Sequence, residues 1–311
     1  MSSTAASSTA ATNDEEGAEP FADEPSQQEE GSTWPTTFDE AKRGRKFVIK
    51  GLREATGTDD TQTMRGIANS LEHCRRANRC GEEACDVCRR LRGRRLTRAA
   101  KAAVANWVAS QRVVAQRRGA NRGMKLAQVT IIPSIKIRRG TKKHLRRQLN
   151  EIHKQLHDAL DEAGVAFAIG YFDVSHNEHE DGEWAPYFCF HLHAVMPYHQ
   201  AKAGEPVLNR RFPNTAAIRD AVKMKPFDAS GRGYSYIFKD RFERRITLPA
   251  HRRADGTWKR QNTRGGKPLT VEQRNRLFVI LHHLGSDARL FLHGAGITEK
   301  ENGRLTIRLG S

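Results

Sequence analysis

Hydrophobic residues in the middle of the chain form three short segments that favour β-strands. Residues 126–137 are rich in Val and Ile, and residues 165–174 and 187–196 are nearly continuous apolar runs. Runs of this length that are rich in β-branched and aromatic residues favour strands. A polar stretch, 175–186, separates the last two runs. The pattern predicts three strands, the last two of which are joined by a loop.

A helical period appears between the first two of these strands. Residues 141–163 carry Leu or Ile three or four positions apart, which places them on one face of a helix. Thr141 is suited to cap the start of this helix, and Gly164 to follow its end. Weaker helical patterns and a short closing strand complete the prediction. The helices are expected at 97–117, 215–223, 234–242 and 270–283, and the strand at 304–309.

The order strand, helix, strand, strand and then helices predicts an α+β fold, with an antiparallel sheet and flanking helices. We expect four segments along the chain. They are a disordered acidic tail (1–33), a basic helical region with a small zinc unit (34–124), the sheet-containing core (125–245) and a C-terminal helix and strand that complete or flank it (246–311).

The charge of the chain indicates which class of partner it binds. The chain has 53 Lys and Arg against 36 Asp and Glu, a net charge of +17 and a pI near 10.0. The acidic residues of the first thirty positions are not balanced by any basic residue there, so the remainder is more basic still. Such a surplus favours nucleic acid as the partner. The sequence has no long apolar run and no signal-peptide pattern, so we expect a cytoplasmic protein that does not bind membranes.

Two histidines in the third strand are candidate metal ligands. In the run Phe188 to Pro197, His191 and His193 alternate with apolar residues, so they share one strand face about 7 Å apart. A divalent metal for phosphoryl chemistry also needs carboxylate oxygen, and Asp173 at the end of the preceding strand is placed to supply it. The alternative is that both histidines are simply hydrogen-bonded residues of a buried strand. Fallback ligands lie in the loop: His176, Glu178, His179 and Glu183.

A tyrosine and a lysine form the second candidate site. Tyr236 and Lys239 are three positions apart and would share one face of a helix. A phenol becomes a useful nucleophile when a cation stabilises its phenolate, and Lys239 can be that cation. Tyr234 is about 140° around the helix from Lys239 and is expected to pack in the interior. Taken alone, this pair is far more typical of a surface helix than of a catalytic site.

Four clustered cysteines form the third candidate site. Cys74, Cys80, Cys85 and Cys88 lie within fifteen positions, and the close Cys-x-x-Cys pair is typical of a structural zinc site with four thiolates. A chance cluster of reduced thiols is the alternative. The cysteines are surrounded by arginines that we expect to contact DNA, although a solvated charged face would look the same. The expected DNA-binding residues are Arg75, Arg76, Arg79, Arg89 and Arg90.

Taken together, these motifs resemble the HUH endonuclease superfamily, and specifically the plasmid rolling-circle replication initiators. The resemblance covers about 126–239. It rests on His191-Leu192-His193 as the His-hydrophobe-His strand and Tyr236-Ile237-Phe238-Lys239 as the Tyr-x-x-Lys helix, with Asp173 as the preceding acidic residue. Asp173 stands where the family often has Glu, and the first strand lacks distinctive residues.

The resemblance implies a metal-dependent nickase that uses Mg²⁺ or Mn²⁺ and has a fold like that of RNA-recognition domains. Its tyrosine would attack origin DNA, single-stranded or extruded as a cruciform, and leave a 5′-phosphotyrosine and a free 3′-hydroxyl primer. A host polymerase would extend the primer. A host helicase would unwind the duplex, because the chain has no nucleotide-phosphate loop of its own. Alternatives are a related transposase or relaxase, or a zinc-dependent DNA-binding protein without catalysis. A different His-rich phosphoesterase, or a cupin-like enzyme, fits the helices and the His-x-His run less well.

Overall fold

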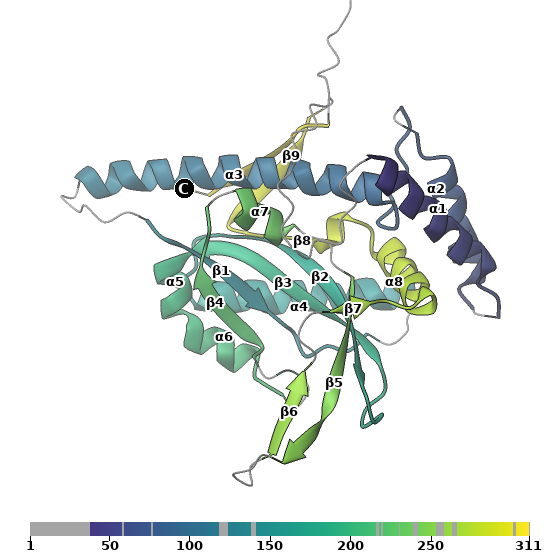
Figure 1. The fold of residues 1–311 in the computed structure, drawn as a ribbon. Coiled ribbons are helices and arrows are strands. Elements are labelled where there is room, and N and C mark those ends of the chain that lie inside the picture. The colour runs from purple at the N-terminus through teal and green to yellow at the C-terminus, as the bar shows by residue number, and fades with distance from the viewer. Residues whose placement is uncertain are drawn as a thin grey trace, which may run out of the picture.

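The fold is α+β, with one large mixed sheet between helices (Figure 1). The computed structural model describes residues 38–311 except 58, 76, 118–123, 138–140, 216–217, 219, 230, 239–241, 253–257, 263–265, 301–302 and 311. The strands are β1 (Leu126–Ile131), β2 (Ala168–His179), β3 (Tyr187–Pro197), β4 (Val222–Pro226), β5 (Glu243–Arg252), β6 (Trp258–Asn262), β7 (Lys267–Pro268), β8 (Leu290–His293), β9 (Ala295–Glu299) and β10 (Leu305–Leu309). The helices are α1 (Phe38–Glu54), α2 (Thr61–Glu72), α3 (Asp86–Arg117), α4 (Lys142–Glu162), α5 (Tyr198–Ala203), α6 (Glu205–Arg211), α7 (Gly231–Ile237) and α8 (Val271–Leu284), with a 3₁₀ turn, η1 (Asp287–Arg289).

The main sheet has the strand order β4-β1-β3-β2-β5-β6, with β7 beside β5 and β8 beside β2. Strand β3 lies at its centre between β1 and β2, and every residue of β3 is buried. This position explains the continuous apolar run of its sequence, since a strand covered on both faces has no solvent side. The predicted pairing of the second and third strands is confirmed.

The expectation of an antiparallel sheet is wrong in one place, because β5 runs parallel to β2. Strands β8 and β5 share the same edge of β2. The antiparallel β8 pairs with Ala168–Tyr171, and the parallel β5 pairs with Ser175–His179. A parallel pair needs a long connection, which the chain between β2 and β5 provides. That connection contains β3, three short helices and β4. The hydrophobic periodicity of these segments does not show that the chain after them pairs with β2 again.

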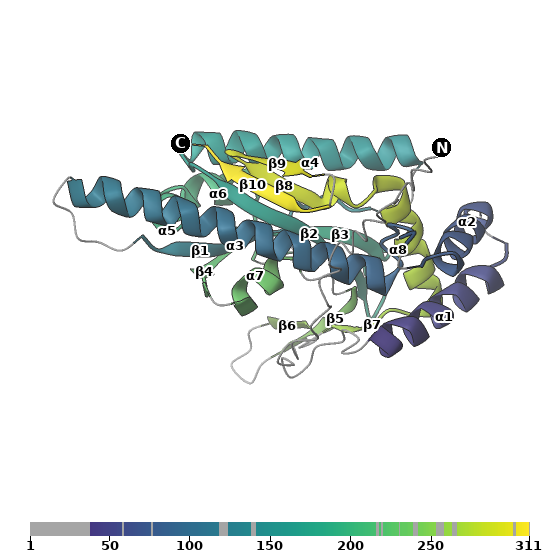
Figure 2. The ribbon, with the colours of Figure 1, turned by 90° about the horizontal axis from the view of Figure 1, so that it is seen from above.

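Each face of the sheet has its own hydrophobic core. On one face, the leucines of α4 pack with Phe172, Phe190 and other residues of β2 and β3. On the opposite face, α3 and α7 pack with Ile169 and Tyr171 of β2 and with β10. Figure 2 shows α4 and α3 on opposite sides of the strands. Alternate residues of β2 therefore belong to different cores, as the strand period requires.

The best-defined helical pattern is confirmed. Helix α4 begins after Thr141, whose hydroxyl accepts a hydrogen bond from the His144 backbone nitrogen at 3.4 Å. Gly164 follows it with a positive φ of 65°, a conformation that glycine adopts at low cost.

Several weaker boundaries differ from the prediction. Helix α3 begins at Asp86, well before residue 97, because the cysteine loop leads directly into it. The expected helix at 215–223 is wrong, since the chain enters strand β4 at Val222 and pairs with β1. Helix α7 ends at Ile237, and the strand expected to reach residue 137 ends at Ile131. At Val222, pairing of β4 with β1 overrides the local helical pattern.

The N-terminal helices are part of the main core. Buried residues of α1 and α2, such as Leu52 and Ile67, belong to the same cluster as α4, α8 and the adjacent sheet face. Asn275 of α8 donates a hydrogen bond to the Gly51 carbonyl at 2.8 Å, which ties α8 to α1. In the part of the chain that the structure describes, no helix is both long and apolar enough to cross a membrane.

Candidate functional site

His191, His193 and Asp173 lie on one face of the sheet. Asp173 is directly opposite His191 in the β2–β3 register, and Tyr171 is directly opposite His193. Directly opposed residues of antiparallel strands project to the same side, so the two imidazoles and the carboxylate share a face. All three are buried. Nε2 of His193 is 3.9 Å from Oδ2 of Asp173.

Two hydroxyl groups that the sequence analysis did not select hold the imidazoles. The Thr130 hydroxyl on β1 is 3.0 Å from Nδ1 of His193, which leaves Nε2 of that ring directed toward Asp173. The Ser175 hydroxyl on β2 is 2.9 Å from Nε2 of His191. The sequence pattern places position 175 in the polar loop, whereas in the structure Ser175 continues β2 two positions after Asp173. Thr130 needs the β1–β3 register, which a sequence pattern does not show.

Tyr236 lies against the histidines, whereas Tyr234 does not. The Tyr236 ring packs edge-on against His193, with ring centroids 5.2 Å apart. Tyr234 is buried against Phe227, with centroids 4.8 Å apart, and burial raises the pKa of its phenol to about 12. This environment agrees with a packing role for Tyr234. The expected partner Lys239 lies outside the described residues.

A different lysine, Lys225 of β4, lies near Tyr236. Its ammonium is 5.1 Å from the centroid of the Tyr236 ring. Burial raises the pKa of Tyr236, the charge of Lys225 opposes that shift, and Asp173 adds to it. The only sequence signal for Lys225 is a basic residue in a short segment, which by itself has no specificity.

The donor set of two imidazoles and one carboxylate suits a divalent metal. Two ligands of one such ion lie roughly 3–4 Å apart, which the His193–Asp173 separation of 3.9 Å satisfies. The ligand atoms of His191, His193 and Asp173 do not all lie within 4.8 Å of one another. Among the described residues, the group whose ligand atoms all lie within 4.8 Å of one another is the four cysteines. The His191 ring, now hydrogen-bonded to Ser175, would have to turn to join a shared ion.

The fallback ligands lie elsewhere. His176 is on the opposite sheet face against Phe188, and burial lowers its pKa to about 4. Nε2 of His179 is 3.0 Å from a Glu183 oxygen, and Glu178 pairs with Arg244 at 3.3 Å. The structure does not bring them to His191 and His193.

The four cysteines converge and could hold a structural metal such as zinc. The Sγ atom of Cys74 is 3.6 Å from that of Cys88 and 3.8 Å from that of Cys85, and those of Cys80 and Cys88 are 3.7 Å apart. Four sulfurs about 2.3 Å from a tetrahedral zinc lie about 3.8 Å apart. These thiols are not disulfide-bonded. Hydrogen bonds from the Cys80 and Cys88 thiols lower the pKa of Cys85.

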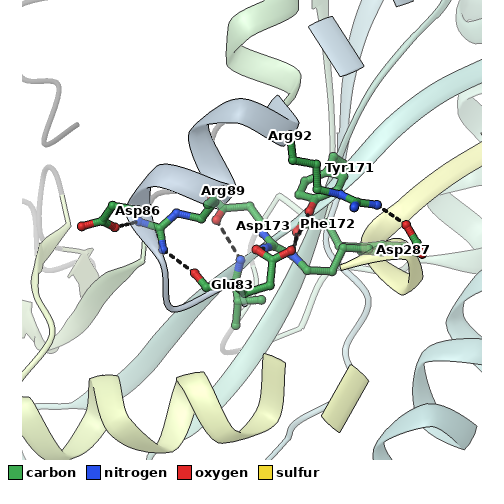
Figure 3. Close-up of polar contacts among 10 residues, drawn as sticks. Glu83, Asp86, Arg89, Arg92, Tyr171, Phe172, Asp173 and Asp287 are labelled. Atoms are coloured by element: carbon green, nitrogen blue, oxygen red, sulfur yellow. Dashed lines mark hydrogen bonds and ion pairs between the residues drawn. The ribbon is translucent and has the colours of Figure 1, made fainter. Parts of the chain in front are cut away.

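The neighbouring arginines have different environments. Arg75 is exposed, and Arg79 and Arg90 are partly exposed, whereas Arg76 lies outside the described residues. Arg89 is buried, donates to the Glu83 carbonyl at 2.8 Å and forms an ion pair with Asp86 (Figure 3). It therefore holds the start of α3 to the cysteine loop and is not available at the surface.

Comparison of the chain with protein-family models, with curated proteins and with solved structures finds no match.

Proposed function

We propose that the chain is a metal-dependent, single-strand DNA nickase, similar to the HUH rolling-circle replication initiators. The observation that carries the proposal is the arrangement around His193. The imidazole is 3.9 Å from the Asp173 carboxylate and its ring is 5.2 Å from that of Tyr236. A metal-ligand set with a phenol beside it is what transesterification by tyrosine requires. The HUH-type fold itself remains part of the proposal.

In the proposed reaction the Tyr236 oxygen forms a bond to a DNA phosphorus, and the bond from phosphorus to the 3′ oxygen breaks. The 3′ oxygen leaves as a hydroxyl after it takes up a proton, while the 5′ phosphate stays on Tyr236. One phosphoester replaces another, so no ATP is required and the strand can be rejoined by the reverse reaction. The free 3′-hydroxyl would prime a host polymerase, and a host helicase would unwind the duplex.

His191, His193 and Asp173 would hold Mg²⁺ or Mn²⁺, which when bound polarises the phosphate as a Lewis acid. Thr130 fixes the orientation of the His193 ring through its 3.0 Å contact with Nδ1. Lys225 favours the phenolate form of Tyr236, because its positive charge lowers the pKa of that phenol. The net charge of +17 supports a DNA backbone as the substrate.

The test uses single-stranded origin oligonucleotide, Mn²⁺ and denaturing gels that display the covalent protein–DNA adduct. Tyr236→Phe should lose both cleavage and adduct, because the nucleophilic oxygen is gone. Tyr234→Phe is the matched control and should keep substantial activity, since that ring packs against Phe227. An adduct that survives in Tyr236→Phe but disappears in Tyr234→Phe would overturn the assignment of the nucleophile.

A second candidate function is DNA binding without catalysis, supported by the compact cysteine cluster next to exposed arginines. It predicts tight, salt-dependent DNA binding that needs zinc, with no cleavage under any metal condition. Wild-type protein that binds origin DNA without ever forming an adduct would favour this function.

A further inference from the structure

The edge of β2 has an interruption at the candidate metal site. Strand β8 pairs with Ala168–Tyr171 and strand β5 begins to pair at Ser175. Among the described residues, no strand pairs with Phe172–Val174 on this edge, and Asp173 is the middle residue of this β2 gap. Backbone groups in such a gap need other partners, because unpaired buried peptide groups are costly.

Arg289, from the 3₁₀ turn η1, supplies one of these partners. Its Nε donates a hydrogen bond to the Phe172 carbonyl at 2.8 Å. On the other side of the gap, the Asp173 side chain itself accepts from the Val174 nitrogen at 2.8 Å. Arg289 has no exposed surface, so its guanidinium needs a buried anion.

That anion comes from the loop between the second and third cysteines of the cluster. Glu83, buried between Cys80 and Cys85, accepts from Arg289 at 2.9 Å. The other oxygen of Glu83 accepts from the Tyr171 hydroxyl at 3.3 Å. Tyr171 precedes the β2 gap and lies opposite His193 in the register. Figure 3 shows Glu83 below the start of α3, and Tyr171 to the right of that helix beside Arg92.

We propose that Glu83 and Tyr171 are positioning residues through which the cysteine cluster sets the geometry of the His191–His193–Asp173 site. Metal binding by the four cysteines fixes the loop that carries Glu83. Glu83 in turn holds Tyr171 and, through Arg289, the Phe172 carbonyl, so that Asp173 stays in place across from His191. This inference rests on the metal site of the proposed function. It adds that the two metal sites are thermodynamically coupled.

The test measures Mn²⁺ affinity by calorimetry on the full-length chain, once with zinc bound and once with zinc removed. Mn²⁺ suits the oxygen and imidazole donors and binds thiolates poorly, so the titration reports on the histidine site. Tyr171→Phe removes only the hydroxyl that contacts Glu83. Tyr234→Phe is the matched control, because it removes a hydroxyl from another buried tyrosine of the same core. Glu83→Gln is a harsher variant, since it leaves the Arg289 charge buried without its anion.

We expect zinc removal to weaken Mn²⁺ binding by wild type and by Tyr234→Phe by about 10-fold, the scale of a lost supporting contact to a ligand. Tyr171→Phe should bind Mn²⁺ about 10-fold more weakly even with zinc, and removing zinc should then have little further effect. A wild-type Mn²⁺ affinity that does not change on zinc removal would overturn the coupling. Wild-type affinity and a wild-type zinc response in Tyr171→Phe would overturn the role of Tyr171 in it.

The coupling and the nickase function can fail separately. If zinc removal weakens Mn²⁺ binding but no DNA adduct ever forms, the coupling is supported and the nickase function is rejected. If the DNA adduct forms but Mn²⁺ affinity does not depend on zinc, the nickase function is supported and the coupling is rejected. Wild-type protein that binds no Mn²⁺ would overturn the metal site on which both proposals rest.

Discussion

At the scale of single residues, the state of Tyr236 is set by opposing charges around a partly buried phenol. Burial raises its pKa, and Asp173 and Glu243 raise it further, while Lys225 and Arg245 lower it. With a raised pKa, only a small fraction of Tyr236 is phenolate at neutral pH, and that fraction grows about tenfold per pH unit below the pKa. Cleavage should therefore rise with pH as long as phenolate formation limits the rate.

The pH profile gives a prediction for Lys225. Lys225→Met removes a charge that lowers the pKa of Tyr236, so the rise in cleavage rate should move to higher pH, with rates converging with wild type at the alkaline end. The measurement is the single-turnover cleavage rate between pH 6 and 10. Lys223→Met is the control, since Lys223 is on the same strand but pairs with Asp220 at 3.1 Å. An unmoved profile in Lys225→Met would show that this lysine does not act on Tyr236, the proposed nucleophile.

At the scale of elements, helix α8 is fixed at its start and tied to the rest of the core. Thr270 and Gln273 form a capping box, in which the Thr270 hydroxyl accepts from the Gln273 nitrogen at 3.2 Å and Gln273 accepts from the Thr270 nitrogen at 3.1 Å. Such reciprocal caps satisfy two backbone donors that the helix itself leaves unpaired. Since α8 packs on α4 and holds α1 through Asn275, its start contributes to the whole N-terminal half.

We expect Thr270→Ala to lower the free energy of unfolding by about 1 kcal/mol, the usual loss for an N-cap hydroxyl. Thr141→Ala, at the start of α4, is the comparison. The Thr141 hydroxyl makes one longer contact of 3.4 Å to the His144 nitrogen, so its loss should be smaller. Urea unfolding of both variants measures the difference. Equal losses would mean that the capping box adds nothing beyond a single hydroxyl.

At the scale of the whole molecule, the cysteine cluster is built into the main core. Cys74, Cys85 and Cys88 are buried in the same cluster of residues as α1, α2, α4 and α8. Glu83, in the same loop, forms the fully buried ion pair with Arg289. The sequence alone predicts a small zinc unit within 34–124, separate from the sheet-containing core. The shared core instead predicts that loss of zinc affects the stability of the entire fold.

Strong chelation should therefore lower the thermal midpoint by roughly 10 °C, in one cooperative transition seen by both circular dichroism and tryptophan fluorescence. Cys85→Ser should have a similar effect and bind less zinc, as measured by atomic absorption. Cys189→Ala is the control, because Cys189 is in β3 outside the cluster and should leave the zinc content unchanged. Two separate unfolding transitions after chelation would show instead that the cysteine segment unfolds independently of the rest of the fold.

The sequence by itself determined the features that depend on local periodicity or on spacing. The leucine stripe of α4 needs only the helical repeat, and the shared face of His191 and His193 needs only the strand repeat. The spacing of the four cysteines is typical of a structural zinc site, although only the structure shows that their sulfur atoms converge. The α+β class follows from the order of such elements.

Only the tertiary structure decided which distant residues meet. Strand β5 joins β2 in parallel because of where a long connection returns, and no local pattern encodes that return. Thr130 reaches His193 through the β1–β3 register, and Arg289 donates to the Phe172 carbonyl in the β2 gap from more than a hundred residues away. Each of these contacts depends on close packing between segments distant in the chain, whereas periodicity describes only what a segment does alone.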